Sequence, residues 1–422
     1  MGALGAAAAV LRSAFVAARF VAEDAPVTCI VVGIGADGMA GLSEASRREL
    51  QSATVIYGSP RQLDLLDDTV PAPRHPWPTP MLPALEALPV NDDVHVVASG
   101  DPLLYGIGGT LIRLHGADRV RVFPHVSSVT LACARMGWAA QDVEIISLVT
   151  APVHTAVRRG GRAVVLSRGS STPAELAAVL TETGRGASEF TVLQQLGGPG
   201  ERIRSGPAEA WATAPLPDID DLNVIAIQYL PDVRVGGTLP DDALRHDGQI
   251  TKQTVRAVTL AALAPRSGQL LWDVGSGSGS IAVEWCRSAS GCLAVAFEKD
   301  GERRGRIVAN ARAFGADIEV RTEAPEDFEG AAQPDVIFIG GGLTAPGLVE
   351  ACLAQLPSGG RLVANAVTVE SEALLLQWHS RLGGELRRFQ HYQGEPLGGF
   401  TGWRPQMPIT QWLLTVVAVT QK

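Results

Sequence analysis

The sequence predicts an α/β protein with two domains, each built on mostly parallel sheets. Short runs rich in β-branched residues alternate with helical stretches along the chain, as in proteins whose strands are joined by crossover helices. The chain of 422 residues is long enough for two or three domains. A stretch rich in proline and glycine follows Leu230 and divides the chain.

Strands are expected wherever a short apolar run is bounded by turn residues. These runs are 28–32, 94–98, 163–166, 191–193, 223–228, 269–274, 293–297, 318–321, 335–339, 361–365 and 409–419. Residues 71–89, PAPRHPWPTPMLPALEALP, are expected to form a surface connection. Proline lacks the amide that a central strand must donate, so this segment cannot be one.

The domain boundaries follow from composition. Residues 231–249, PDVRVGGTLPDDALRHDGQ, have linker character, and ITKQTVRAVTLAALAP then places apolar residues at helical spacing. We therefore predict one domain over 27–230 and a second over 250–422. Residues 1–26 are Ala-rich, carry no basic residue before Leu11 and contain two arginines, so we expect a loose extension.

Bulk composition excludes several classes of protein. The formal net charge of −9 gives no general attraction for phosphate, so we expect no nucleic-acid partner. Beyond the extension, no run is long and apolar enough to span a bilayer, and we expect no membrane partner. The five cysteines form no C-x-x-C pair, which predicts reduced thiols, a cytoplasmic location and no metal site.

A glycine loop in the second half, LLWDVGSGSGSIAVEW, predicts a nucleoside cofactor. An apolar strand ends at Asp273, and a helix is expected near Ser280. Between them lie Gly275, Ser276, Gly277, Ser278 and Gly279. Glycines let a ligand lie against the backbone at the helix N-terminus. The next strand ends at Glu298, 19 residues after Gly279, where a carboxylate can accept from both ribose hydroxyls.

Two cofactors fit such a loop. A dinucleotide site reads G-x-G-x-x-G or A, whereas the spacing here is G-x-G-x-G and Ser280 stands at the third small position. This favours S-adenosylmethionine over NAD. Ala324 follows the third strand of this half, where an adenine contact is expected. An NAD-dependent oxidoreductase and a non-catalytic binding protein remain the alternatives.

Four motifs in the second half identify a family. HDGQITK, WDVGSGSGSIAVEW, PDVIFIGGG and GGRLVANAVTVE together resemble the decarboxylating C15-methyltransferases of cobalamin biosynthesis, from about Asp241 to the C-terminus. The resemblance implies that Thr251 covers the cofactor. It also implies that Gly275 to Gly279 hold the cofactor and that Glu298 binds its ribose.

The first half carries three further blocks. VASGDPLLYGIGGTL runs a strand into Gly100 and Asp101, with a helix expected from Pro102. VVGIGADGMAGLS places Gly33 and Gly35 after the first strand. In PHVSSVTLACARMGW, Ser127 and Ser128 begin a helix.

In this order the three blocks resemble the tetrapyrrole methylases, and residues 27–230 resemble the precorrin C5-methyltransferases. The resemblance implies two α/β lobes with the cofactor in the cleft between them. Cofactor contacts are implied at Gly100, Asp101, Tyr105, Ser127 and Ser128, besides the loop of Gly33 and Gly35. His125 and Val126 stand where the family often has proline and glycine.

The two halves together resemble the fused precorrin-6Y C5,15-methyltransferases (decarboxylating). This implies a tetrapyrrole methylase fold followed by a Rossmann-like methyltransferase domain, with one S-adenosylmethionine site in each. It implies methylation of a small-molecule tetrapyrrole at C5 and C15, loss of carbon dioxide from the C12 acetate, and a homo-oligomer. Methylation at other ring positions is the nearest alternative.

Catalytic residues are not evident, because methyl transfer from a sulfonium depends on positioning rather than on a strong nucleophile. Lys252 and Arg256 lie beside the ITK turn and could bind substrate carboxylates, or form a solvated helix face. His246 and Asp247 could relay a proton, but we favour the interpretation that they are exposed linker residues. The joined domains could limit escape of an intermediate between the two sites.

Overall fold

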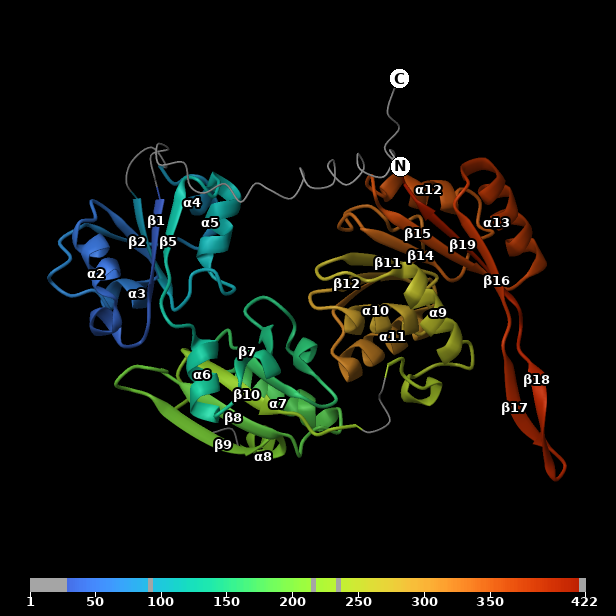
Figure 1. Ribbon diagram of the computed structural model, residues 1–422, viewed down its shortest axis with the longest axis horizontal. Helices are drawn as coiled ribbons and strands as arrows, with labels where there is room; N and C mark the ends of the chain where they lie inside the picture. Colours follow the sequence, from blue (N-terminus) through green and yellow to red (C-terminus); the bar gives the residue numbers. More distant parts are fainter. Residues whose placement is uncertain (1–28, 90–93, 214–217, 233–236, 417–422) are drawn as a thin grey trace, which may run out of the picture.

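The structure, a computed structural model, describes residues 29–89, 94–213, 218–232 and 237–416 (Figure 1). The predicted extension, 1–26, lies outside the described residues. Within the described ranges, no helix combines the length and apolar character needed to cross a membrane. The chain folds into two lobes in its first half and a third α/β unit in its second half (Figure 1).

The first lobe contains a five-stranded parallel sheet in the order β3-β2-β4-β1-β5. Its strands are β1 (Cys29–Ile34), β2 (Ile56–Gly58), β3 (Arg74–Pro76), β4 (Val94–Ser99) and β5 (Val120–Phe123). Its helices are η1 (Gly38–Gly41), α2 (Glu44–Gln51), α3 (Pro60–Asp64), α4 (Leu82–Glu86) and α5 (Ile107–His115). The proline-rich segment supplies α4 and β3, which is an edge strand, as the missing proline amides require.

The second lobe differs from the expected mostly parallel sheet. Its order is β6-β7-β10-β8-β9, and only β6 and β7 pair in parallel. Its strands are β6 (Glu144–Ser147), β7 (Arg162–Leu166), β8 (Glu189–Gln194), β9 (Arg202–Pro207) and β10 (Asn223–Gln228), and its helices are α6 (Ser128–Met136), η2 (Ala140–Asp142), η3 (Val153–Ala156), α7 (Thr172–Glu182) and α8 (Ala208–Thr213). The link from β8 to β9 is too short for a crossover, so these strands form a hairpin.

The second half has a seven-stranded sheet in the order β13-β12-β11-β14-β15-β19-β16. Its strands are β11 (Leu270–Val274), β12 (Leu293–Phe297), β13 (Ile318–Arg321), β14 (Val336–Ile339), β15 (Arg361–Ala366), β16 (Glu385–Phe389) and β19 (Ile409–Thr415). Its helices are η4 (Asp241–Ala243), α9 (Gln253–Leu263), α10 (Ser280–Ser288), α11 (Gly301–Phe314), α12 (Leu348–Gln355) and α13 (Val369–Leu382). Five strands are parallel, and β19 and β16 add antiparallel pairs at one edge.

A two-stranded hairpin leaves this sheet. It consists of β17 (Tyr392–Leu397) and β18 (Phe400–Pro405) and extends away from the rest of the domain (Figure 1). Phe400 is 84% exposed and Trp403 is 77% exposed. Large apolar side chains at this exposure are typical of a surface that binds another protein.

The two halves touch through η3 and the end of α11. Arg159 pairs with Asp232 at 2.8 Å, and its guanidinium lies 4.3 Å from the centre of the Phe314 ring. A nitrogen of the His154 ring lies 3.1 Å from the carbonyl oxygen of Ala316. A Cβ on Gly315 would lie 2.3 Å from the carbonyl oxygen of Val157, so a glycine is needed for this approach. The domains are therefore packed against each other, not only tethered.

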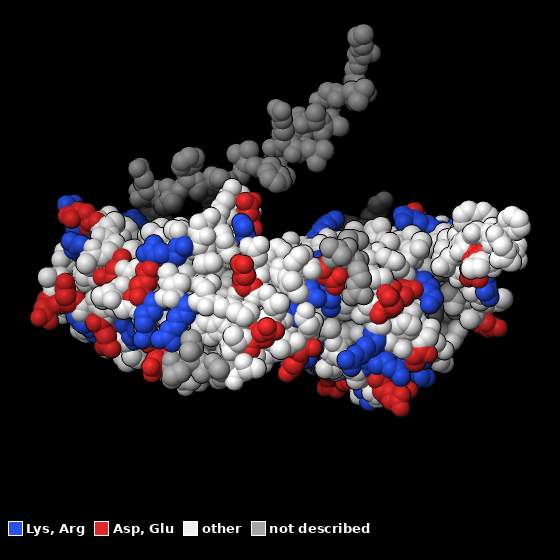
Figure 2. All heavy atoms as spheres, turned by 90° about the horizontal axis from the view of Figure 1, so that it is seen from below, with Lys and Arg blue, Asp and Glu red and all other residues white. Residues whose placement is uncertain are grey.

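Charge on the face shown in Figure 2 is mixed. Lysine and arginine side chains alternate there with aspartate and glutamate over both halves of the molecule. That face therefore presents both signs of charge side by side.

Candidate functional site

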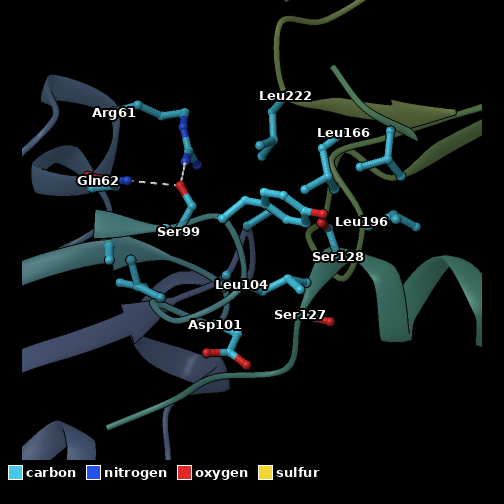
Figure 3. Close-up of a pocket in the computed structure, with 18 of the residues that line it drawn as sticks. Arg61, Gln62, Ser99, Asp101, Leu104, Ser127, Ser128, Leu166, Leu196 and Leu222 are labelled. Atoms are coloured by element: carbon cyan, nitrogen blue, oxygen red, sulfur yellow. Dashed lines mark hydrogen bonds between the residues drawn. The ribbon is translucent and has the colours of Figure 1, made fainter. Parts of the chain in front are cut away.

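A cavity of about 430 Å³ lies between the two lobes of the first half (Figure 3). The first lobe contributes the ends of β1 and β4 and the loops that follow them. The second lobe contributes apolar side chains, among them Leu166, Leu196 and Leu222, which face those loops across the cavity. A mostly apolar cavity of this size with a few polar groups is typical of a small-molecule site.

Six of the seven residues predicted for the first site line this cavity: Gly35, Gly100, Asp101, Tyr105, Ser127 and Ser128. Gly100 has φ +54°. Tyr105 has φ +52°, which is uncommon for a non-glycine residue and often marks a functional site. Ser127 caps α6 by accepting a hydrogen bond from the Thr130 amide at 3.1 Å, as the sequence predicted.

Gly33 does not line the cavity. It lies inside β1, where a Cβ would come within 2.0 Å of the carbonyl oxygen of Gly100. A Cβ on Gly35 would lie 2.7 Å from Nε2 of His125, which in turn lies 3.3 Å from Oδ1 of Asp37. The glycines thus let the strand ends and the His125 ring pack closely beside the cavity.

The loop after β4 corrects one expectation. The helix predicted from Pro102 begins only at Ile107, with Gly106 as its N-cap. The Asp101 carboxylate accepts a hydrogen bond from the Leu103 amide at 2.9 Å and forms a turn. Tyr105 has a positive φ, which an α-helix does not allow, so no helix runs through this position. The residues between Gly100 and Gly106 therefore form a loop over the cavity.

Three further lining residues, Arg61, Gln62 and Ser99, were not predicted from the sequence. Gln62 donates a hydrogen bond through Nε2 to Oγ of Ser99 at 2.8 Å, and Arg61 donates through Nη2 to the same oxygen (Figure 3). The pattern Ser59-Pro60-x-Gln62 does indicate a capped helix start. Nothing in it indicates that the helix faces a cavity.

The glycine loop of the second half adopts the predicted conformation. Gly275, Gly277 and Gly279 all have positive φ, between +61° and +75°. A Cβ on Gly275 would lie 2.6 Å from Cα of Gly341, in the loop after β14. The loops that follow β11 and β14 therefore meet at the carboxyl end of the sheet, where ligands of open α/β sheets bind.

The Asp273 side chain holds this loop through hydrogen bonds. Its Oδ2 accepts hydrogen bonds from Oγ of Ser276 at 2.7 Å and from the Ala282 amide at 3.1 Å. The side chain is buried, and burial raises the pKa of Asp273 to about 6. Ser278 is buried too, and its carbonyl accepts from the amide of the Asn310 side chain at 2.9 Å. These groups position the loop.

Glu298 lies directly on the glycine loop. It follows β12, and its Oε2 accepts a hydrogen bond from the Gly277 amide at 2.8 Å. Its Oε1 accepts from the Asp300 amide at 3.0 Å. The carboxylate is thus fixed beside the loop, at the end of the strand next to β11. At this place a carboxylate can accept hydrogen bonds from the hydroxyls of a ribose. Ala324 follows β13 and packs partly against the core.

Arg256 has no exposed surface. It donates to Oδ1 of Asp241 at 2.7 Å, to the carbonyl of Thr251 at 2.5 Å and to the carbonyl of Leu239. A substrate carboxylate would have to displace these partners, so this guanidinium is placed to hold the segment that carries Thr251. Lys252 is about half exposed, with Asp241 at 3.8 Å.

Asp247 pairs with Arg303 at 2.9 Å and Arg306 at 2.8 Å. The hydrogen bond from the Gln249 amide, together with these arginines, lowers the pKa of Asp247 to about 2. A carboxylate with that pKa stays ionised near neutral pH, so it is poorly suited to relay a proton. Its interactions attach the HDGQITK segment to α11.

In the described part of the chain, no three His, Cys, Asp or Glu side chains form a group that could hold a metal ion.

Each half of the chain matches a known protein family. The tetrapyrrole (corrin/porphyrin) methylase family matches residues 28–212, and the precorrin methyltransferase domain family matches residues 242–416. A precorrin-6Y C(5,15)-methyltransferase (decarboxylating) of Mycobacterium tuberculosis is 69% identical over 387 residues, which are 92% of this chain and 99% of that protein.

The chain belongs to the precorrin-6Y C(5,15)-methyltransferase family. A member from a Sinorhizobium species is 44% identical and covers 91% of this chain and 95% of its own length. The C-terminal domain of the member from Rhodobacter capsulatus has a solved structure, with 44% identity over 44% of this chain and all of that one, at a TM-score of 0.41. The family and fold predicted from the motifs are confirmed.

Proposed function

We propose that the chain methylates a precorrin-6Y-type corrin precursor at C5 and C15 and removes the carboxyl group of its C12 acetate. The observation that carries this proposal is the presence of both sites in one chain: a cavity between two lobes, and a glycine loop with Glu298. Membership of the family along 92% of the chain supports the same conclusion.

S-adenosylmethionine fits both places, and as a sulfonium it supplies an activated methyl group when bound. In the second domain the glycines leave the backbone uncovered, and Glu298 is fixed where a ribose would lie. In the first domain Gly35, Gly100, Ser127 and Ser128 line the cavity. Asp273, Ser276, Ser278 and Arg256 position the second site and need not touch the donor.

The chemistry asks little of the protein beyond position and exclusion of water. In each transfer a new carbon–carbon bond forms to the methyl group, the carbon–sulfur bond breaks, and the macrocycle then loses a proton. In the decarboxylation, carbon dioxide leaves and the remaining methylene carbon takes up a proton. The apolar wall of the first cavity provides the water-poor surroundings that such transfers need.

The direct test is the mass of the product. The purified chain would be incubated with the reduced form of precorrin-6 and methyl-labelled donor. We expect a gain of two methyl groups and loss of one carboxyl group. One methyl with the carboxyl retained would mean that the second domain has another role. No methylation despite donor binding would mean that the substrate is a different one.

We also propose that the chain forms homo-oligomers through the β17–β18 hairpin. The support is the exposure of Phe400 and Trp403 at its tip and side. Light scattering should give a mass above that of one chain, and Phe400→Ser with Trp403→Ser should lower it. A monomer in both cases would contradict the proposal.

The domain boundaries predicted from the sequence, 27–230 and 250–422, remain our proposal, supported by the separate sheets of the two halves. We further propose a cytoplasmic location. All five cysteines are free thiols and none is exposed. Reduced cysteines are the norm in that compartment.

A further inference from the structure

Among the described residues, the Arg61 side chain in the first cavity has no ion-pair partner. Arg61 and Asp101 are the charged residues among those that line it, and Figure 3 draws their side chains apart from each other. In the part of the chain that the structure describes, no carboxylate forms an ion pair with Arg61. The single hydrogen bond that its guanidinium makes there goes to the Ser99 hydroxyl, which leaves its other N–H groups available.

The position of this guanidinium is fixed by a chain of hydrogen bonds. The Ser59 amide donates to Oε1 of Gln62 at 2.8 Å, within the capping box that begins α3. Gln62 then donates to Ser99 at 2.8 Å, and the same Ser99 oxygen accepts from Arg61. Gln62 and Ser99 therefore hold Arg61 in place before any ligand arrives, which lowers the entropic cost of binding.

We propose that Arg61, positioned by Gln62 and Ser99, binds a carboxylate of a ligand in this cavity. A planar guanidinium with free donors matches the two oxygens of a carboxylate in a bidentate geometry. Two ligands of the proposed function carry one: the acetate and propionate side chains of the corrin substrate, and the amino-acid end of the methyl donor. The inference thus rests on the proposed function.

The energetics favour this assignment. Burial lowers the pKa of Arg61, because the guanidinium has lost water and faces mainly apolar side chains. A partly desolvated cation without a counter-ion is costly to maintain, and an arriving carboxylate would offset that cost. Asp101 does not do so in the structure, since its side chain lies apart from Arg61 and its Oδ1 accepts from the Leu103 amide.

The test compares full-length wild type with Arg61→Gln and Arg61→Lys. Arg113→Gln is the matched control, because Arg113 is an exposed arginine on α5 of the same lobe. Methylation at C5 would be followed with the reduced precorrin-6 substrate, to give separate KM and kcat values. Calorimetry would measure binding of S-adenosylhomocysteine and of 5′-methylthioadenosine, which lacks the amino-acid carboxylate.

We expect Arg61→Gln to raise one KM or dissociation constant by about tenfold to a hundredfold, as for loss of a charge-assisted hydrogen bond. Arg61→Lys should recover part of the loss. A raised substrate KM with unchanged S-adenosylhomocysteine binding assigns the carboxylate to the substrate. Weaker S-adenosylhomocysteine binding with unchanged methylthioadenosine binding assigns it to the donor.

Unchanged binding of substrate and of S-adenosylhomocysteine in Arg61→Gln would overturn the inference. Binding of 5′-methylthioadenosine, which carries no carboxylate, reports whether the first domain of the variant is folded, and methylation at C15 in the other domain should also stay at the wild-type level. Failure of the proposed function would look different, because wild type itself would then leave the corrin substrate unmethylated. The comparison of the two nucleosides would still decide the role of Arg61 in that case.

Discussion

Gly275 is required by two features of the backbone at the second site. Its φ is +68°, and a Cβ there would lie 2.6 Å from Cα of Gly341. Gly275→Ala would have to separate the loops after β11 and β14. Since a displacement of about 1 Å can cost a hundredfold in rate, we expect at least a tenfold loss of C15 methylation and decarboxylation.

The product mass measures this effect, because methylation at C5 should continue in the same molecule. Gly305→Ala is the control, since Gly305 is exposed in α11 and a Cβ there meets nothing within 4 Å. Equal C15 activity in Gly275→Ala and Gly305→Ala would contradict the account of this loop.

Asp273 gives a prediction about pH. Burial raises its pKa from 3.8 to about 6, so between these values the folded state binds more protons than the unfolded state. The stability of the second domain should therefore fall as pH rises from about 4 to about 6, by on the order of 2 kcal/mol from this group. Asp273→Asn cannot ionise, so wild type should lose stability relative to it over that range. A difference in unfolding free energy that is independent of pH would contradict this.

At the residue scale the sequence predicted the glycine loop and Glu298, because their spacing reflects backbone geometry. It did not predict the cavity residues Arg61, Gln62 and Ser99. These come from α3 and from the end of β4, and only the packing of the lobe brings them together. A local pattern cannot report a contact between residues 38 positions apart.

At the element scale, α9 is attached to the preceding segment by Arg256. The guanidinium is buried and donates hydrogen bonds to Asp241 and to the carbonyls of Leu239 and Thr251. Arg256→Ala would leave these groups without their donor, and we expect a loss of about 3–5 kcal/mol in unfolding free energy. Denaturant unfolding measures it, with faster proteolysis within residues 239–251 as a second readout.

Lys252→Ala is the matched control, since this exposed side chain should change stability by less than about 0.5 kcal/mol. If Arg256→Ala kept wild-type stability but weakened substrate binding, the guanidinium would be a substrate-binding group instead of a structural one.

All eleven predicted strands are present, because buried runs such as β11 and β14 have a strong apolar signal. The strands that were missed are short or exposed, including β2, with three residues, and β9 and β17, with few buried side chains. Their pairing depends on neighbouring strands more than on their own composition. The prediction of mostly parallel strands was wrong for the second lobe, where the short connection from β8 to β9 forms a hairpin.

At the scale of the whole molecule, the contact between η3 and α11 joins the two active domains. The linker composition predicted the division of the chain, but not this contact, which relies on backbone carbonyls such as that of Ala316. Gly315→Ala would place a Cβ 2.3 Å from the carbonyl oxygen of Val157 and should loosen the contact. If the joined domains limit escape of the intermediate, this variant should release about severalfold more singly methylated corrin.

Mass analysis of the solution during turnover would quantify that release. Arg312→Ala is the control, because its ion pair with Glu182 lies in the same contact but is exposed and contributes little. Equal release from wild type, Gly315→Ala and Arg312→Ala would mean that the domain contact has no kinetic role.

We propose that one chain carries two independent sites for the methyl donor. Calorimetric titration of the full-length protein with S-adenosylhomocysteine tests it most directly. We predict two molecules bound per chain, reduced to one by Gly275→Ala. Binding of a single molecule per wild-type chain would contradict the account.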